Sequence, residues 1–408
     1  MGTTVTAAHG QRPAILQVIP RLDGGGAERT VGEMSAAITR AGWRALVLAE
    51  HGRLSDAVRA AGGEIVEFPA SSKSPLRMWR NASAMAKFIK ANNVRLIHAR
   101  SRAPAWSALR AARLTGIPFV TTYHGAYGEK GAMKKIYNSV MARGDLVIAN
   151  SAFTRDLVRA RYGTPENKIV VVNRGVDLDA FEPSMISADR TAKLRKDWGL
   201  GPDTKVILLA ARLTDWKGQT VLIDAAGELK KRGTMGDAVV ILAGDAQGRD
   251  GYVAELDASI TRHGLNGRVK RVGHVADVAA AFATAWVTVV ASTKPEAFGR
   301  SAAEAEALGC PVIATRLGAP QETVLAEPEV SSHERTGWLV TPGDAQALAS
   351  ALEEALGLSV DARRALGERA RRHVAQNFSL RGLQLETLAV YDRLLGTELS
   401  EAFRRAKT

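Results

Sequence analysis

The chain of 408 residues is too long for one ordinary hydrophobic core, so two domains are the first expectation. Its composition, 46% hydrophobic and 24% charged, excludes a disordered, collagen-like or coiled-coil protein, and its single cysteine excludes an internal disulfide framework. The net charge of +13 indicates that an anionic partner binds somewhere on the surface. No apolar run approaches the roughly 18 residues of a membrane span, and the first dozen residues lack the apolar core of a signal peptide. The sequence therefore predicts a cytoplasmic protein of two domains.

The first half of the chain alternates short apolar, β-branched runs with longer stretches of helical spacing. Strands alternating with helices indicate parallel βαβ units, and hence an open sheet covered on both faces. We expect this domain to occupy residues 1–182 and to be followed by a polar, proline-containing linker over residues 183–204. The predicted strands are Ala14–Pro20, Arg44–Ala49, Glu64–Phe68, Arg95–His98, Pro118–Tyr123, Asp145–Ala149 and Lys168–Val172.

A second series of the same kind follows, which predicts a second domain over residues 205–378. The last helical stretch, Leu380–Lys407, is longer than a final crossover needs, so residues 379–408 are expected to pack back onto the first domain. The fold class is therefore α/β, with two tandem Rossmann-like, doubly wound domains. The strands predicted in the second domain are Lys205–Ala211, Ala238–Gly244, Val269–Val272, Trp286–Ala291, Pro311–Thr315 and Gly337–Val340, with helices near 217–232, 252–264, 299–309 and 344–357.

The positive charge is concentrated in one part of the first domain. Between Lys73 and Asp145 there are fourteen lysines and arginines against two acidic residues, so this stretch accounts for +12 of the net charge. In segments 73–90 and 130–143 the basic residues flank tryptophan, methionine and other apolar residues, as in helices that lie on a membrane surface. In the alternative interpretation the apolar residues face the core and the cations are solvated. The two segments together favour contact with an acidic membrane leaflet.

Ligands of open α/β sheets bind beyond the carboxyl ends of the strands, so the loops there are the candidate sites. After the first strand, Gly25 and Gly26 open a helix, where backbone N–H groups can approach an anion; a tight turn without a ligand is the alternative. His124 directly follows the strand Pro118–Tyr123 and is a candidate site residue. His98 also ends a strand and is interpreted as structural.

In the second domain, Arg212 and Lys217 flank a loop between a strand and a helix. Two cations five residues apart can converge on one pocket, and a diphosphate leaving group needs such a counter-charge. An isolated basic pair on the surface is the alternative.

The segment 294–304 is the most informative of the chain. Glu296 stands in a loop where its carboxylate can accept hydrogen bonds from sugar hydroxyls. The backbone N–H groups of Ala297, Phe298 and Gly299 are expected to face the same space at the start of a helix. Glu304 lies in that helix and can accept a bidentate bond from a ribose diol. We expect Glu306, two residues later, to be solvated.

These residues resemble the retaining glycosyltransferases of family 4, whose fold of two Rossmann-like domains is called GT-B. The resemblance runs from the glycine loop to Ser379 and is most specific at the E-x7-E motif, Glu296 to Glu304. It implies that Glu296 contacts the donor sugar, that Glu304 contacts the ribose, and that Arg212 and Lys217 hold the diphosphate. Gly25 and Gly26 match the family's glycine loop and His124 its catalytic histidine. The usual N-G-V-D reads Arg174 to Asp177 here, and the G-G-x-x-E loop reads Gly318 to Glu322.

The resemblance further implies a retaining, metal-independent transfer in which no cofactor is needed. The donor is expected to be GDP-mannose or a UDP-hexose, and the acceptor an anionic glycolipid such as a lipopolysaccharide core. We expect peripheral attachment to the cytoplasmic membrane leaflet and no binding of nucleic acid.

Three other functions compete with this one. A nicotinamide-dependent dehydrogenase would need a G-x-G-x-x-G loop and an acidic residue for the ribose, and the chain has neither at the expected place. A sugar-nucleotide epimerase shares the architecture but needs no anionic acceptor surface. A nucleic-acid-binding protein would explain the basic stretch, but not the motifs of the second domain.

Overall fold

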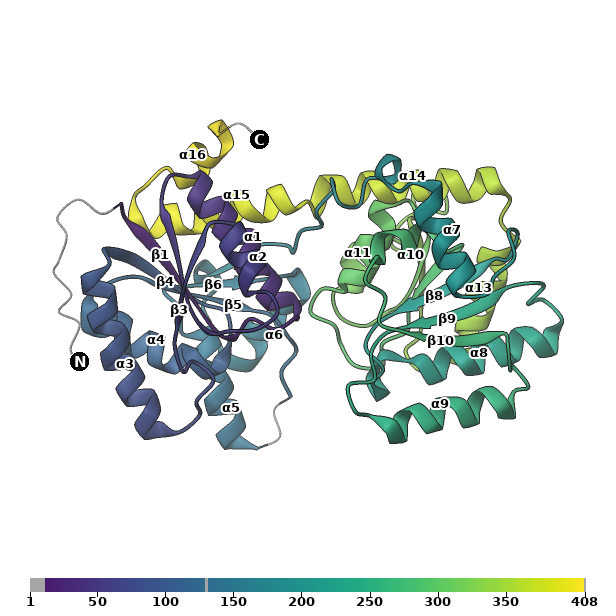
Figure 1. Ribbon diagram of the computed structural model, residues 1–408, viewed down its shortest axis with the longest axis horizontal. Coiled ribbons are helices and arrows are strands. Elements are labelled where there is room, and N and C mark those ends of the chain that lie inside the picture. The colour runs from purple at the N-terminus through teal and green to yellow at the C-terminus, as the bar shows by residue number, and fades with distance from the viewer. Residues whose placement is uncertain (1–11, 129–130, 407–408) are drawn as a thin grey trace. The chain divides into compact units, whose positions relative to one another are not determined.

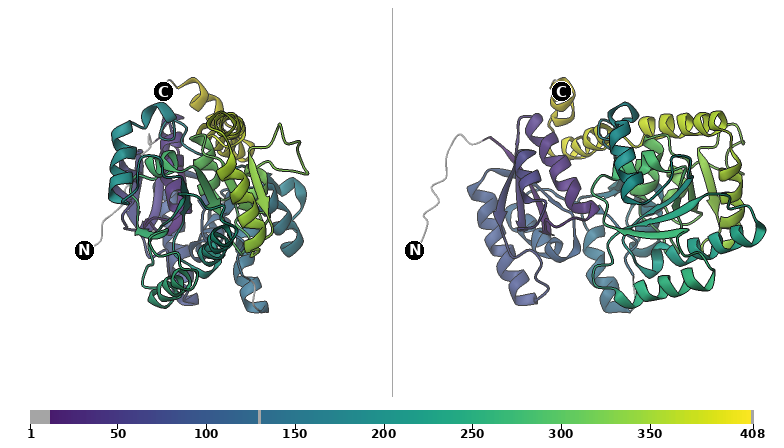
Figure 2. Two further views of the ribbon diagram at one scale, coloured as in Figure 1. Left: turned by 90° about the vertical axis from the view of Figure 1, so that its right-hand side faces the viewer. Right: turned by 45° about the vertical axis from the view of Figure 1, so that its right-hand side comes forward.

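The computed structural model describes residues 12–128 and 131–406, and the chain divides into two compact units. The N-terminal unit runs up to Asn173 and resumes at Leu380, and the C-terminal unit runs from Arg174 to Ser379 (Figure 1). Both units contain a parallel sheet with helices on both faces (Figure 2). The predicted α/β fold with two Rossmann-like domains is confirmed.

The sheet of the N-terminal unit has seven strands in the order β3-β2-β1-β4-β5-β6-β7, all parallel. Its central strands are nearly continuous apolar runs because helices cover them on both sides. Every strand predicted for this half is confirmed, with ends that differ by at most one residue. The strands are β1 (Ala14–Arg21), β2 (Arg44–Glu50), β3 (Gly63–Glu67), β4 (Val94–Ala99), β5 (Phe119–Tyr123), β6 (Leu146–Ala149) and β7 (Ile169–Val171).

Two hydrophobic clusters fill the faces of this sheet. One contains residues of α3 and α4, and the other contains residues of α1 and of the two C-terminal helices. The helices of this unit are α1 (Gly26–Arg40), α2 (Ser55–Ala60), α3 (Pro75–Ala91), α4 (Arg102–Thr115), α5 (Ala132–Ser139), α6 (Ala152–Tyr162), α15 (Leu380–Leu395) and α16 (Leu399–Arg405), with 3₁₀ turns at Val140–Ala142 and Glu166–Lys168.

The C-terminal segment packs beside α1, as the sequence predicts (Figures 1 and 2). It forms two helices instead of one, because Gly396 has a φ of +64°, a backbone conformation that ends α15. The Tyr391 hydroxyl lies 2.7 Å from His98 Nδ1, and Thr122 Oγ1 lies 2.6 Å from His98 Nε2. His98 is fully buried, and this burial lowers its pKa well below the usual value. The interpretation of His98 as structural is confirmed.

The sheet of the C-terminal unit has six parallel strands in the order β10-β9-β8-β11-β12-β13. All six predicted strands are confirmed: β8 (Val206–Ala210), β9 (Val239–Ala243), β10 (Val269–Gly273), β11 (Val287–Val290), β12 (Val312–Thr315) and β13 (Gly337–Val340). The helices are α7 (Ala188–Asp197), α8 (Gln219–Arg232), α9 (Asp250–Arg262), α10 (Val278–Thr284), α11 (Arg300–Ala307), α12 (Pro320–Thr323), α13 (Ala345–Gly357) and α14 (Val360–Asn377), with 3₁₀ turns at Pro183–Met185 and Asp215–Lys217.

The prediction of a linker over residues 183–204 is wrong. This segment belongs to the C-terminal unit and contains α7, whose N-terminus is capped by Ser187. Arg190 forms a salt bridge of 2.7 Å to Asp277, the residue that caps α10, and Trp198 is buried in the core. The polar composition of the segment suggested a linker, but Leu194, Trp198 and Leu200 pack into the hydrophobic cluster on one face of the sheet.

Candidate active site

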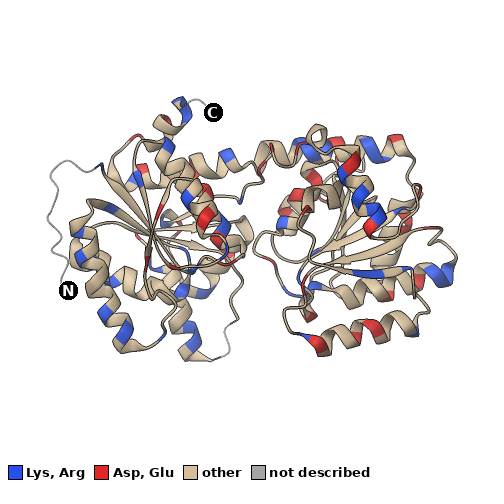
Figure 3. Cartoon of the chain, in the orientation of Figure 1, with Lys and Arg blue, Asp and Glu red and all other residues tan. Residues whose placement is uncertain are grey.

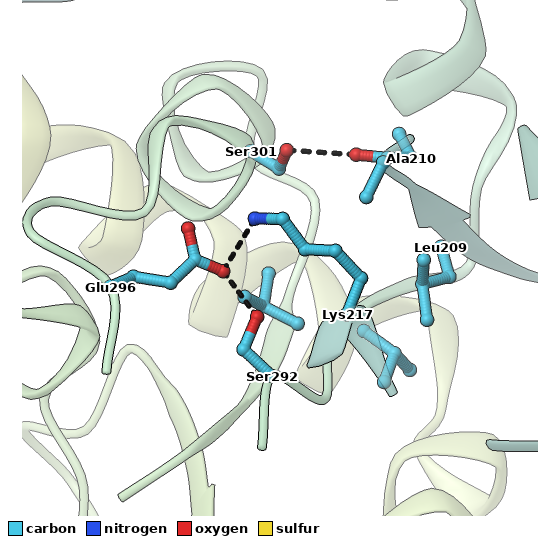
Figure 4. A pocket seen from close by; sticks show the side chains of 9 residues that line it. Leu209, Ala210, Lys217, Ser292, Glu296 and Ser301 are labelled. Atoms are coloured by element: carbon cyan, nitrogen blue, oxygen red, sulfur yellow. Dashed lines mark hydrogen bonds and ion pairs between the residues drawn. The ribbon is translucent and has the colours of Figure 1, made fainter. Parts of the chain in front are cut away.

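A pocket opens at the carboxyl ends of β8 and β11, the two neighbouring strands at which the strand order of the C-terminal sheet reverses. Ligands of doubly wound sheets bind at this switch point. Figure 4 shows how Lys217, Ser292, Glu296 and Ser301 meet around the pocket. The full lining is Leu209, Ala210, Ala211, Lys217, Val289, Val290, Ser292, Glu296 and Ser301.

The centre of the pocket is an ion pair between two of the predicted site residues. Lys217 Nζ lies 2.8 Å from Glu296 Oε1, and the side chains are only 17% and 11% exposed. The Ser292 hydroxyl donates a hydrogen bond to the same carboxylate oxygen (Figure 4). A cation and an acceptor-only carboxylate therefore stand side by side, as recognition of a sugar joined to a phosphate requires.

Gly218 explains how Lys217 reaches this position. The residue has a φ of +76°, and a Cβ added to it would stand 1.9 Å from the carbonyl oxygen of Ala291. Only glycine allows this contact, which brings the Lys217 turn against the end of β11. The backbone N–H of Thr293 also donates to the Trp216 carbonyl at 2.8 Å. The turn with the cation is thus attached to the loop that carries Glu296.

A second glycine holds Glu296 from the other side. Gly318 has a φ of +79°, and its Cβ would lie 2.5 Å from the Glu296 carbonyl oxygen. That oxygen accepts a hydrogen bond of 3.0 Å from the N–H of Ala319. The loop after β12, where the sequence departs from the G-G-x-x-E pattern, therefore positions the Glu296 backbone.

Ala297, Phe298 and Gly299 lead into α11, whose N-cap is Gly299 with a φ of +84°. Phe298 is buried, and its ring packs against Phe378 with centroids 5.7 Å apart, so only its backbone is available to a ligand. The Ser301 hydroxyl donates to the Ala210 carbonyl at 2.9 Å and ties the start of α11 to the end of β8.

The other two motif residues are outside the pocket lining. Glu304 is 7% exposed and pairs with Arg300, one turn earlier in α11, at 2.9 Å. Arg212 is exposed, and its carbonyl accepts a hydrogen bond from Gln219 at 3.0 Å. The structure thus brings Lys217 and Glu296 into contact with each other, whereas Arg212 and Glu304 lie outside the pocket that these two residues line.

The expectation that Glu306 is solvated is wrong. Glu306 is fully buried, and one of its oxygens accepts a hydrogen bond of 2.8 Å from the Thr336 hydroxyl. Burial raises the pKa of the Glu306 carboxyl well above its usual range, and the Thr336 bond opposes this effect only partly. A helix position two residues after Glu304 points to the opposite side of α11, which here faces the core.

This buried acid predicts a pH-dependent stability. Above the ordinary pKa of 4.5 the unfolded chain loses the Glu306 proton while the folded chain keeps it, so wild-type stability falls as pH rises. We expect Glu306→Gln to remove a slope of about 1.4 kcal/mol per pH unit, which persists up to the folded-state pKa. Urea unfolding at several pH values measures the slope. Glu368→Gln, at an exposed position of α14, is the control and should match the wild type; parallel curves for all three proteins would contradict the expectation.

Gly25, Gly26 and His124 belong to the N-terminal unit. Gly25 is the N-cap of α1, and a Cβ at this position would stand 2.2 Å from Glu28 Oε2, so the glycine allows the Glu28 carboxylate to lie against the backbone. His124 directly follows β5 and is half-buried. Both predicted loops therefore lie at the carboxyl ends of central strands, where the topology places ligand sites.

Sequence reasoning missed Ser292, Ser301 and Arg300. All three are small or polar residues directly after β11 or within the first turn of α11, so their place beside the E-x7-E motif was a usable signal. Their partners could not be read from the sequence, because those partners are Glu296, the carbonyl of Ala210 and Glu304.

Two models of known protein families match the chain. The family model described as Glycosyltransferase Family 4 matches residues 24–180, and that described as glycosyl transferases group 1 matches residues 190–373. A D-inositol 3-phosphate glycosyltransferase of Paenarthrobacter aurescens is 30% identical over 72% of this chain and 72% of its own length. A GDP-mannose-dependent alpha-(1-6)-phosphatidylinositol monomannoside mannosyltransferase of Mycobacterium tuberculosis is 29% identical over 74% of this chain and 76% of its own. The crystal structure of a glycosyltransferase from Rickettsia africae superposes with a TM-score of 0.85 at 32% identity, covering 96% of this chain and 100% of that chain.

Proposed function

We propose that this chain, which belongs to glycosyltransferase family 4, transfers a hexose from a nucleotide-diphosphate sugar to an anionic glycolipid, with retention of configuration and without a metal ion. The observation that carries the proposal is the contact between Lys217 and Glu296 at the switch point of the C-terminal sheet. Family membership favours transfer over the epimerase and nucleic-acid-binding functions that the sequence left open.

Lys217 is suited to neutralise the charge that develops on the leaving diphosphate. Its ammonium group pairs with the Glu296 carboxylate. A bound donor would give the ammonium group a phosphate partner and leave the Glu296 carboxylate free to accept hydrogen bonds from sugar hydroxyls. Arg212 is exposed at the start of the same loop and is the candidate for the second cation, although it lies outside the lining of the pocket.

In the proposed step the bond between the anomeric carbon and the diphosphate oxygen breaks, and a bond to the acceptor hydroxyl forms on the same face. The acceptor proton passes to the leaving phosphate oxygen. The charge is balanced, because the hydroxyl loses one proton and the diphosphate takes it up. We assign to His124 a role close to the reacting centre, where it assists this transfer.

His124→Ala should abolish transfer while donor binding stays close to the wild-type level, because the diphosphate ligands lie in the other unit of the chain. The measurement is product formation together with titration of the donor. His51→Ala, which changes an exposed histidine paired with Glu67, is the control. Loss of donor binding with His124→Ala would contradict the assignment.

The donor can be identified by thermal shift with UDP, GDP and ADP, because a ligand that binds only the folded state raises the unfolding midpoint. The expected donors are GDP-mannose and the UDP-hexoses, and the name of the mycobacterial relative supports the first. We expect one of the nucleoside diphosphates to raise the unfolding midpoint. In a second experiment without acceptor or metal, the enzyme should slowly release that nucleoside diphosphate from the matching sugar nucleotide. No shift with any of the three would contradict the proposal.

The acceptor assignment is supported by basic and apolar residues on two helices of the N-terminal unit, α3 and α5, whose lysines and arginines are blue in Figure 3. Four large apolar side chains of these helices are exposed: Leu76 (61%), Trp79 (53%), Met133 (81%) and Ile136 (55%). The same helices carry exposed cations, namely Arg77, Arg80, Lys87 and Lys90 on α3 and Lys134 and Lys135 on α5. Lys130 of the predicted segment 130–143 lies outside the described residues.

The core interpretation therefore holds for Met85, Ile89, Val140 and Met141, which are buried. It does not hold for the four exposed side chains, which suit an amphipathic contact with an anionic lipid surface. Such a surface would hold a lipopolysaccharide core or a phosphatidylinositol glycolipid, and the acceptor of the mycobacterial relative supports the lipid-linked class. None of the helices in residues 12–128 and 131–406 has the length and hydropathy that crossing a bilayer requires.

We expect the chain to float with vesicles that contain phosphatidylglycerol and to stay behind with vesicles of neutral lipid, because about 1 kcal/mol is gained per cation near an anionic surface. Replacing Trp79 and Met133 by serine should reduce flotation several-fold. Leu114→Ser, which changes an exposed leucine of α4, is the matched control. Equal recovery with both kinds of vesicle would exclude this docking mode.

A further inference from the structure

We propose that α5 and the loop 124–128 act as one unit. In this unit the buried side chain of Asn138 positions His124, and it couples the docking of α5 on a lipid surface to the conformation of the loop. The inference rests on the lipid docking and on the role of His124 proposed above. It adds a positioning residue that neither the motifs nor the pocket indicate.

Asn138 joins three elements of the N-terminal unit. It is fully buried at the end of α5. Its Oδ1 accepts a hydrogen bond of 2.8 Å from Arg102 Nη1 at the start of α4, and its Nδ2 donates to the Gly128 carbonyl at 3.3 Å. Both ends of the amide are therefore engaged, one with a charged donor and the other with the loop that begins at His124.

The loop itself is held by the same arginine. The guanidinium of Arg102 lies over the Tyr127 ring, 4.1 Å from its centroid. The Tyr127 carbonyl accepts a hydrogen bond of 2.6 Å from Arg161, and the Tyr127 N–H donates to the Gly125 carbonyl at 2.9 Å. Tyr127 also packs on Tyr123, the last residue of β5, with ring centroids 4.7 Å apart. These contacts restrict the conformations open to the backbone of loop 124–128 as long as the Asn138 amide keeps the Arg102 guanidinium in place.

The opposite face of α5 carries two exposed apolar side chains, because Met133 and Ile136 point outward while Asn138 points inward. The Trp106 indole of α4 donates to the Tyr137 carbonyl at 3.1 Å, and the Arg143 guanidinium lies 5.1 Å from the Trp106 ring centroid. The outer and inner faces of α5 belong to one hydrogen-bonded helix of about two turns. A lipid contact on its outer face therefore acts on Gly128 through the amide of Asn138.

The positioning role can be tested without donor or acceptor, by the Cε1–H resonance of His124 in the full chain, assigned by its absence in His124→Ala. We expect Asn138→Ala to displace this resonance and Asn138→Asp, which keeps the acceptor for Arg102, to restore it in part. Asn92→Ala is the matched control, because the Asn92 amide also donates to a carbonyl, that of Phe88, but lies at the end of α3. Unfolding midpoints identify a variant that fails to fold. An unchanged His124 resonance in folded Asn138→Ala would overturn the positioning role.

The coupling to lipid is tested by hydrogen exchange of segment 119–128 with and without phosphatidylglycerol vesicles. We expect the vesicles to change exchange in the wild-type chain, and to leave it unchanged in Asn138→Ala although that variant still floats with them. The same change in both proteins would overturn the coupling. If the wild-type chain does not bind the vesicles, the coupling falls together with the proposed lipid docking, whereas the His124 resonance still decides the positioning role.

Discussion

Lys217→Ala should lower the rate of sugar transfer by about 10²- to 10³-fold at saturating donor, because it removes the cation that we propose to neutralise the leaving diphosphate. Its ammonium group is the partner of Glu296 at 2.8 Å, so the variant also leaves that carboxylate, only 11% exposed, without a cation. Lys217→Arg should restore a part of the rate, since it returns the charge but not the shape of the ammonium group. Release of the nucleoside diphosphate from the donor measures the effect.

Lys294→Ala is the matched control for this experiment. Lys294 pairs with Asp215 at 3.2 Å next to the same turn, but the two side chains are 63% and 74% exposed. An exposed pair of this kind contributes about 0–1 kcal/mol, so the rate should stay within about twofold of the wild type. A Lys217→Ala enzyme with undiminished turnover would show that the diphosphate is neutralised elsewhere.

Gly318→Ala should reduce both activity and stability, although the change adds a single methyl group outside the pocket. The new Cβ would stand 2.5 Å from the Glu296 carbonyl oxygen, at a backbone φ of +79° that alanine rarely adopts. To relieve this contact, either the loop with Glu296 or the loop after β12 must move. Movement of the loop after β12 would break the hydrogen bond from the Ala319 N–H to the Glu296 carbonyl. We expect a loss of about 1–3 kcal/mol in the free energy of unfolding and a fall in transfer of at least about tenfold, because a small misplacement of a positioning group has a large effect on rate.

Gly343→Ala separates strain from the contact with Glu296. Gly343 has a nearly identical φ of +76°, but a Cβ there meets nothing within 4 Å. The free energy of unfolding of this control should therefore fall by only about 1 kcal/mol, which is the cost of the backbone conformation, and its transfer activity should be unchanged. Urea unfolding and transfer assays on both variants make the comparison, and equal activity losses would refute the positioning of Glu296 by Gly318.

The strands were predictable because each is a short apolar run, and burial between two helix layers demands that pattern wherever a parallel strand occurs. The loops with Lys217 and Glu296 were predictable for a related reason, since topology restricts ligand sites to the carboxyl ends of strands. Polar composition was a poor guide at residues 183–204, where a few apolar residues of α7 and of the turn after it are enough to pack against one face of the sheet.

The two doubly wound domains and the return of the C-terminal helices to the first of them could be predicted from the residues alone, because they depend on local periodicity and on spacing along the chain. Three features required the folded structure: the pairing of Lys217 with Glu296, the burial of Glu306, and the contact of Asn138 with the loop of His124. These depend on which side of an element meets which neighbour, and the neighbours come from distant parts of the chain. Asn138 and Gly128 are 10 residues apart and Lys217 and Glu296 are 79 apart, and no periodic pattern in the sequence marks such pairs. The role of a glycine that permits a close backbone contact can be assigned only when that contact is known.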